Sequence, residues 1–386
     1  MLADARFKFA LDCLKKCITM GPKNNFFFSP HLLYHNLLLA YFGAIYDLES
    51  TLRQILHIPD SITKYTVEEY YTNGGDDYFF YIANGSENSY TCRIYYKIII
   101  DESKGLYVDS LNLHATANSV KECNFSDRPN LVRNFVNNIV SCTTQSYIQN
   151  LLPPNSIDEN TEIIMFNTIY FKGRFDKNCD TAVDTQNEKN TLIAKHIIYK
   201  SEQLDLFITE VPCKEKKMST FFLYPSQKEL DENNSIEVQK LNKLLEQLTT
   251  EEGSRELRKL LDDGIQELEG MVFPITIKDV KIEHDLPIYK LLEMLGIPDF
   301  TPISGTAKLY DYGFDSVQLG DIVHRVSVNL TSNDIMATAS NVMFTYNACK
   351  HARKIPETVN IIFPCICLVY DRTRHNILFC GMLRES

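Results

Sequence analysis

The chain has 386 residues, of which 44% are hydrophobic, and its formal net charge at pH 7 is -11 with a pI near 5.4. This hydrophobic content predicts a globular protein with a sizeable core, and the acidic balance disfavours nucleic-acid binding, which needs clustered Lys and Arg. No uncharged apolar stretch reaches the roughly eighteen residues that a membrane span needs. Charges recur through the first seventeen residues, which does not fit a signal peptide. Either the protein stays inside the cell or its signal has been removed.

The cysteines and glycosylation motifs leave the cellular location open. The eleven cysteines are odd in number, scattered and free of CxxC pairs, so we predict neither a disulfide framework nor a metal site. Cys365 and Cys367 lie two apart in an apolar strand pattern, which indicates core packing. Four N-glycosylation sequons favour secretion but also arise by chance; they begin at Asn84, Asn124, Asn233 and Asn329.

The chain begins with helical patterns. An apolar stripe in residues 7–18 predicts an amphipathic helix on a core. Three phenylalanines at 26–28 indicate a short strand that ends at Ser29, and Pro30 suits the first turn of the strongly apolar helix that follows. Ser29 is expected to be the N-cap of that helix. A third helix is predicted around residues 48–56.

Strands dominate the rest of the chain. Residues 161–172 are apolar on both faces, as at the centre of a sheet, and the buried Asn167 among them needs hydrogen-bond partners. Further patterns predict strands at 92–101, 205–212, 219–225, a strand pair at 271–284 and two or three strands at 358–383, with helices at 131–140 and two within 233–268 split at 251–253. Without a regular βαβ period, this order predicts a single α+β domain over residues 1–386 rather than a Rossmann sheet.

Residues 324–356 hold the strongest functional signal. After a strand-like start they continue for more than twenty residues without a helical stripe or a glycine, and so long a segment is usually functional or disordered. The small residues at 337–340 would fit into a sheet, and Lys350, Arg353 and Lys354 suit the cleavage site of a trypsin-like protease. A surface loop that is cut by accident is an equal alternative on these grounds.

Catalytic signatures are missing from the sequence. It contains no GxSxG, GxxxxGK[ST], HExxH or GxGxxG motif. His31 and His35 have helical spacing but no intervening Glu, which favours core or capping roles. We therefore predict that the protein is not an enzyme, although a convergent Ser-His-Asp triad has no sequence signature of its own.

Four collinear stretches carry a resemblance to a known family. They are NNFFFSPHLLYHNLLLAYFGA at 24–44, TTQSYIQNLLPPNSIDENTEIIMFNTIYFKGRFD at 143–176, LYDYGFDSVQLGDIVHRVSV at 309–328 and FPCICLVYDRTRHNILFCGML at 363–383. Together they resemble the serpins over nearly the whole length of the chain. The residues of the first stretch are most similar to those of the secreted serpins of insects.

The resemblance implies a metastable domain with three β-sheets, eight or nine helices and an exposed reactive loop at about 333–357. Such a protein is a suicide substrate for a serine protease. The protease cuts the loop, which then inserts as a new central strand and carries the acylated protease with it. We therefore expect a monomer that traps a trypsin-like serine protease covalently, without a cofactor, metal, nucleic acid or membrane. An extracellular glycoprotein is expected, with a cytoplasmic protein as the alternative.

The same resemblance assigns roles to individual residues. Ser29, Asn167 and His324 occupy the positions of the polar cluster, called the shutter, through which the central sheet opens. Leu32 replaces a second shutter serine and Phe175 replaces a tryptophan. The hinge that starts insertion comprises Asp334, Ile335, Met336, Ala337, Thr338, Ala339 and Ser340.

Strand alternation would turn one set of loop residues inward on insertion, namely Ile335, Ala337, Ala339, Asn341, Met343 and Thr345. Asp334 departs from the glycine of the family's inhibitors. With Ile335 and Asn341, it suggests an alternative, a non-inhibitory serpin that acts as a binding or structural protein. An inhibitor of a cysteine protease is a further alternative.

The cleaved bond has two candidate positions. Counting the family's usual seventeen residues from the hinge ends at Ala348, whereas counting back from Pro364 ends at Arg353. The difference, 353 − 348 = 5, would be an insertion in the loop. We favour Arg353-Lys354, because an exposed arginine suits a common protease specificity, with Lys350 and Ala348 as alternatives.

Overall fold

The structure is a computed structural model of the chain. It describes all residues except 1, 21–24, 74–80, 86–88, 105–119, 176–192, 214, 227–233, 266–270, 277–278, 298–307, 310–316, 332, 346–364 and 384–386.

Eight helices are described. They are α1 (Leu2–Thr19), α2 (Pro30–Gly43), α3 (Tyr46–Ile55), α4 (Lys64–Asn73), α6 (Pro129–Thr143), α7 (Asn234–Leu248), α8 (Glu251–Asp263) and α9 (Ile288–Met294).

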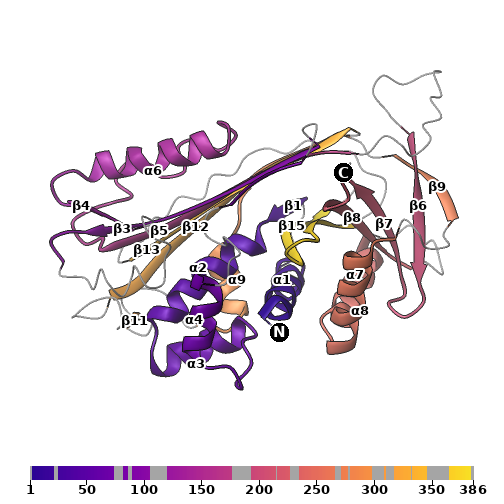
Figure 1. The fold of residues 1–386 in the computed structure, drawn as a ribbon, viewed down its shortest axis with the longest axis horizontal. Coiled ribbons are helices and arrows are strands. Elements are labelled where there is room, and N and C mark those ends of the chain that lie inside the picture. Colours follow the sequence, from indigo (N-terminus) through magenta and orange to yellow (C-terminus); the bar gives the residue numbers. More distant parts are fainter. Residues whose placement is uncertain are drawn as a thin grey trace.

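A large central sheet runs through the molecule (Figure 1). Its order is β10 (Val280–Asp285), β12 (Val317–Leu330), β13 (Asp334–Thr345), β5 (Ile163–Arg174), β3 (Tyr90–Asp101) and β2 (Tyr81–Asn84). Two short strands lie off this path: β11 (Lys308–Leu309) pairs with β12, and β4 (Val120–Cys123) pairs in parallel with β3.

The remaining strands follow one continuous path of pairing. Its order is β1 (Phe26–Phe28), β15 (Asn376–Leu383), β14 (Cys365–Asp371), β8 (Met218–Pro225), β7 (Leu206–Pro212), β6 (Ile193–Ser201) and β9 (Met271–Thr276). The resemblance implies two sheets besides the central one. Here the pairing of β6 with β7 joins these described strands into one path.

The helices cover the central sheet unequally. In Figure 1, α6 lies alone above one face, while α2, α9, α4 and α3 lie below the other face, and α7 and α8 lie beside β7 and β8. The larger core cluster contains residues of α1 and α2 with those of both sheets, and a smaller cluster lies beneath α6. The central sheet is therefore apolar on both faces, as the pattern of residues 161–172 predicted.

Local sequence rules account well for the first elements. Ser29 is the N-cap of α2, because its side chain accepts a hydrogen bond from the Leu32 N–H, and Pro30 occupies the first turn. Every residue of α2 is buried, in agreement with its strongly apolar sequence. The predicted amphipathic helix at the start of the chain is likewise present as α1.

Two details of the predicted elements were wrong. Glu251, Glu252 and Gly253 do not separate two helices but form the first turn of α8, whose N-cap is Thr250; acidic residues suit the positive end of the helix dipole. Residues 271–284 do form two strands, but these do not pair with each other. β9 pairs with β6 and β10 with β12, a choice set by tertiary contacts that alternation alone does not specify.

Candidate functional site

Strand β13 forms the centre of the candidate site. It holds residues 334–345, the first part of the segment predicted to be an exposed loop, and it lies between β12 and β5, antiparallel to both. Its register with β5 is unbroken from Asp334, opposite Arg174, to Phe344, opposite Ile164. The structure therefore holds the segment inside the sheet, where both of its backbone edges find hydrogen-bond partners.

One face of β13 enters the larger core. Ile335, Ala337, Ala339 and Met343 all belong to that cluster and are at most 1% exposed. Asn341 lies on the same face by alternation and is also fully buried. The predicted inward set is thus correct at these five positions, whereas the side chain of Thr345 lies outside the described residues.

The opposite face of β13 lies beneath α6. Val342 and Phe344 join the smaller core cluster there, which includes Val132, Val136 and Val140 of α6. The hydroxyls of this face are buried but satisfied. Thr338 Oγ1 donates to the Ile169 carbonyl at 2.7 Å, and Ser340 Oγ donates to Thr168 Oγ1 at 2.8 Å. These small polar side chains therefore fit a buried strand without unpaired hydroxyls.

Asp334 has a specific place in the turn between β12 and β13. Thr331 Oγ1 donates to Asp334 Oδ1 at 2.7 Å and accepts the Asp334 N–H at 3.1 Å, while the Thr331 N–H donates to the Asp334 carbonyl at 2.8 Å. The Phe175 N–H also donates to the Asn333 carbonyl at 2.9 Å, which ties the turn to β5. Asp334, which stands where the family's inhibitors have glycine, thus forms hydrogen bonds that hold this turn when the segment lies in the sheet.

The three residues that the resemblance assigns to the shutter, Ser29, Asn167 and His324, contact the start of α2 or its cap. The Ser29 N–H donates to His324 Nε2 at 3.1 Å, and Ser29 Oγ donates to the Leu378 carbonyl at 2.7 Å. Asn167 Nδ2 donates to the Leu32 carbonyl at 2.9 Å. Leu32 fills the position of the second shutter serine with a fully buried side chain, and its backbone still links Ser29 to Asn167.

His324 is held neutral by its surroundings. Burial lowers the pKa of His324 to about 3, and the neighbouring His284 also lowers it. Because Nε2 accepts the Ser29 N–H, the proton of the neutral ring resides on Nδ1. His284 has a pKa below the usual value, again because of burial, and its Nε2 lies within hydrogen-bond distance of the Phe27 backbone.

A buried ion pair that sequence reasoning missed lies on the face of the central sheet opposite to that of His324. Arg325 Nε and Nη2 donate to the two carboxylate oxygens of Asp285 at 2.6 and 3.0 Å, and the two side chains are only 8% and 9% exposed. Arg325 Nη1 also donates to the Asn150 carbonyl at 3.3 Å. The pair therefore joins β12 and β10 to the segment after α6 that covers β13. The alternation of residues 324–330 places Arg325 opposite in face to His324, but it gives no sign that this face is buried.

The other predicted site residues lie apart from this cluster or outside the described part. Arg353, Lys354, Lys350 and Ala348 all fall within residues 346–364, and Asn233 is likewise outside the described residues. Of the remaining sequons, Asn84 is exposed on β2, and Asn329 is half-buried on β12. Asn124 is half-buried and accepts the Asp127 N–H at 2.7 Å. Glycosylation and the cleaved bond stay predictions.

The predicted core roles of His31 and His35 are confirmed. Both rings are buried on α2 with centroids 4.2 Å apart, and His31 Nδ1 pairs with Asn376 Nδ2 at 2.8 Å. The nine described cysteines are unpaired, with Cys365 and Cys367 fully buried as predicted. No described helix is both long and apolar enough to cross a membrane.

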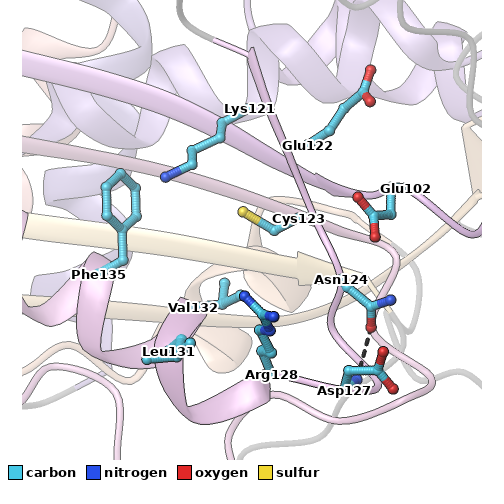
Figure 2. A pocket seen from close by; sticks show the side chains of 10 residues that line it. All are labelled: Glu102, Lys121, Glu122, Cys123, Asn124, Asp127, Arg128, Leu131, Val132 and Phe135. Carbon is cyan, nitrogen blue, oxygen red and sulfur yellow. Dashed lines mark hydrogen bonds between the residues drawn. The ribbon is translucent and has the colours of Figure 1, made fainter.

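A cavity of about 580 Å³ lies apart from the shutter, between β4 and the start of α6 (Figure 2). Lys121 Nζ lies 3.9 Å from the ring centroid of Phe135, and Arg128 borders the same space. Glu102, Glu122 and Asp127 also line it. This mixture of charges favours no single class of ionic ligand, so we assign the cavity no role.

Comparison with known proteins identifies the family. The family model described as "Serpin (serine protease inhibitor)" matches residues 4–385, and the chain belongs to the serpin family. Serine protease inhibitor 88Ea of Drosophila melanogaster is 23% identical over 98% of this chain and 89% of its own length. Human Serpin B3 is 24% identical over 98% of each chain.

The solved structures that resemble the chain agree with the serpin fold. Cleaved Serpin 42Da has a TM-score of 0.73 at 18% identity, covering 100% of this chain and 97% of its own. A loop-inserted structure of cleaved ovalbumin has a TM-score of 0.70 at 16% identity and covers 100% of both chains. The predicted α+β serpin fold is therefore confirmed.

Proposed function

We propose that this serpin is a suicide-substrate inhibitor of a trypsin-like serine protease. The observation that carries the proposal is the position of β13, because a reactive loop can trap a protease only if its first part fits into the central sheet. Residues 334–344 fit there in continuous register with β5, and no charged side chain of β13 points into the larger core. The hinge of this chain is thus compatible with insertion.

The proposed reaction begins as ordinary proteolysis. The protease serine attacks the carbonyl carbon of Arg353, the Arg353-Lys354 peptide bond breaks, and the carbonyl becomes an ester of the serine while Lys354 leaves as a free amine. Residues 334–345 then enter the sheet as β13. The twelve residues of the strand extend over about 40 Å at roughly 3.3 Å per residue, so the acylated protease moves far from where it first bound before water can cleave the ester.

The free energy for this movement comes from burial. Ala337, Ala339, Val342 and Phe344 leave water for the two core clusters, and each square ångström of apolar surface removed from water contributes roughly 25 cal/mol. Backbone hydrogen bonds to β12 and β5 form along both edges of the strand. We infer that the form that meets the protease holds this segment outside the sheet and is metastable for that reason.

The non-inhibitory alternative loses much of its support at the hinge. It was suggested by Asp334, Ile335 and Asn341. In the structure Asp334 closes the turn before β13, Ile335 is fully buried in the larger core, and Asn341 occupies the interior of the sheet. An inhibitor of a cysteine protease would use the same insertion and differ only in its target.

We further propose a monomer that acts outside the cell without a cofactor, does not catalyse a reaction itself, and binds neither nucleic acid nor membranes. The acidic net charge of -11 supports the exclusion of nucleic acid, and the sequons support secretion. A cytoplasmic location is the alternative, and the nine unpaired described cysteines are compatible with it.

A denaturing gel tests the proposal. The protein is mixed with trypsin in near-equal amounts and boiled in detergent. We expect a band at the summed mass of the two proteins and a released carboxy-terminal peptide that begins at Lys354. Arg353→Ala is expected to abolish the band, whereas Lys350→Ala, the matched control in the same loop, is expected to keep it. A clean cut with fully active trypsin and no stable complex would contradict the proposal.

A further inference from the structure

A row of polar side chains crosses the interior of the central sheet. His324 on β12 lies directly opposite Asn341 on β13, and Asn341 lies directly opposite Asn167 on β5. All three side chains are on the face of the larger core by alternation, and all are at most 1% exposed. Asn341 belongs to the inserting segment, so the row is complete only when β13 is in the sheet.

Four polar atoms in this row are buried and have no hydrogen-bond partner among the described residues. They are His324 Nδ1, Asn341 Oδ1, Asn341 Nδ2 and Asn167 Oδ1. Buried polar groups in native proteins are almost always paired, and each unpaired one is destabilising. Four such atoms on three neighbouring residues therefore call for a physical explanation.

The chemistry of the four atoms is complementary. Because His324 Nε2 accepts the Ser29 N–H, Nδ1 carries the proton and is a donor. Because Asn167 Nδ2 already donates to the Leu32 carbonyl, the free atom of Asn167 is the acceptor Oδ1. Asn341 lies between them with one acceptor and one donor.

We infer that the Asn341 side-chain amide bridges His324 and Asn167 when the loop is inserted. His324 Nδ1–H donates to Asn341 Oδ1, and Asn341 Nδ2 donates to Asn167 Oδ1, so all four atoms gain a partner. Directly opposed residues of an antiparallel pair have Cβ atoms about 4.5–5.5 Å apart, so the Asn341 amide lies within side-chain reach of both neighbours. Asn341 is then a positioning residue that fastens the inserted strand to the shutter.

The bridge requires an amide. A leucine, which has the same branching but no polar atoms, would leave His324 Nδ1 and Asn167 Oδ1 buried without partners, and a hydroxyl would supply one donor on a shorter side chain. Asn341, which by itself looks unfavourable for insertion, becomes a favourable residue through its two neighbours. This inference rests on the proposed function only in that β13 enters the sheet from outside.

The stability of the loop-cut protein tests the bridge without any target protease. The loop is cut with a metalloprotease, which forms no acyl-enzyme, and the guanidinium midpoint is measured for the wild type, Asn341→Leu and Met343→Leu. Met343 lies on the same strand face two residues away and serves as the matched control. We expect Asn341→Leu to lower the folding constant of the cut protein by about tenfold or more, Met343→Leu to lower it much less, and neither change to affect the uncut protein comparably.

The outcomes separate the bridge from the proposed function. If cutting stabilises the wild type but Asn341→Leu leaves the cut form equally stable or more stable, the bridge is refuted and insertion stands. If cutting stabilises none of the proteins, β13 does not enter the sheet and the proposed function fails as well. As a second readout, the ¹⁵N resonances of His324 in the cut protein should report a proton on Nδ1 and shift in Asn341→Leu; unchanged resonances would also refute the bridge.

Discussion

A single charge placed on the inward face of β13 should turn the inhibitor into a substrate. Ala339 is fully buried in the inserted strand, between Val326 of β12 and Ile169 of β5. Ala339→Glu would bring a carboxyl group into this apolar environment. Before cleavage the proposed loop is in water, so the substitution acts on the insertion step rather than on the first encounter with the protease.

The magnitude follows from the cost of that carboxyl group. An ionised carboxylate in the core loses several kcal/mol of hydration, so the group would enter protonated. Keeping a Glu with an ordinary pKa of about 4.3 protonated at pH 7.4 costs about 4 kcal/mol, since one pKa unit corresponds to about 1.36 kcal/mol. If this cost raises the barrier to insertion, the rate of ester hydrolysis relative to the rate of trapping increases about a thousandfold.

The assay compares covalent complex with cut inhibitor on a denaturing gel over a range of inhibitor-to-trypsin ratios. Ala339→Glu should give cut inhibitor and active trypsin with almost no complex. Asn333→Glu adds the same charge at an exposed position of the turn before β13 and should trap like the wild type. A normal fraction of complex from Ala339→Glu would refute the account of how β13 is buried.

Two further predictions concern the residues around the shutter. Arg325→Met should lower the free energy of unfolding, measured in urea, by about 3–5 kcal/mol, because Asp285 is then left as a buried charge without its arginine partner. The double variant Arg325→Met with Asp285→Leu should recover most of this loss. A double variant as unstable as the single one would contradict the pairing. Stability should also fall on acidification. The pKa of His324 is lowered to about 3 in the folded protein, so below about pH 6.5 the unfolded chain takes up a proton that the folded chain does not, and stability falls by about 1.4 kcal/mol per pH unit for this group until the pH nears 3. The slope of stability against pH between 6 and 4 should be smaller in His324→Gln, and an unchanged slope would show that His324 is not held neutral by folding.

The sequence predicted the elements whose local signals agree with their burial. Ser29 and Pro30 marked the start of α2 because a cap and a first-turn proline act within one turn of helix. The double-sided apolar pattern of residues 161–172 identified a central strand, and β5 lies in the interior of the sheet. Once the resemblance to serpins had placed residues 335–343 in a strand, alternation also predicted the inward face of β13.

Other features depend on which strands become neighbours, and residue patterns do not contain that information. Ser29, Asn167 and His324 are far apart in the chain, and only the resemblance to serpins placed them together. Arg325 and Asp285 lie opposite each other on β12 and β10, and both side chains are buried. Alternation alone predicts that a strand face with polar residues is exposed. The sequence indicates that Asp334 is unfavourable for loop insertion, because its hydrogen bond with Thr331 exists only after the turn has formed.

Hydrogen exchange of residues 334–345 tests the central claim most directly. Backbone amides of this segment are exposed to water in a loop but bonded to β12 and β5 in the sheet. The intact protein and the metalloprotease-cut protein are compared by mass spectrometry of peptides from this segment, with peptides from β5 as the internal reference. The account predicts fast exchange before the cut and slow exchange after it. Fast exchange after the cut, or equally slow exchange before it, would contradict the claim that cleavage drives this strand into the central sheet.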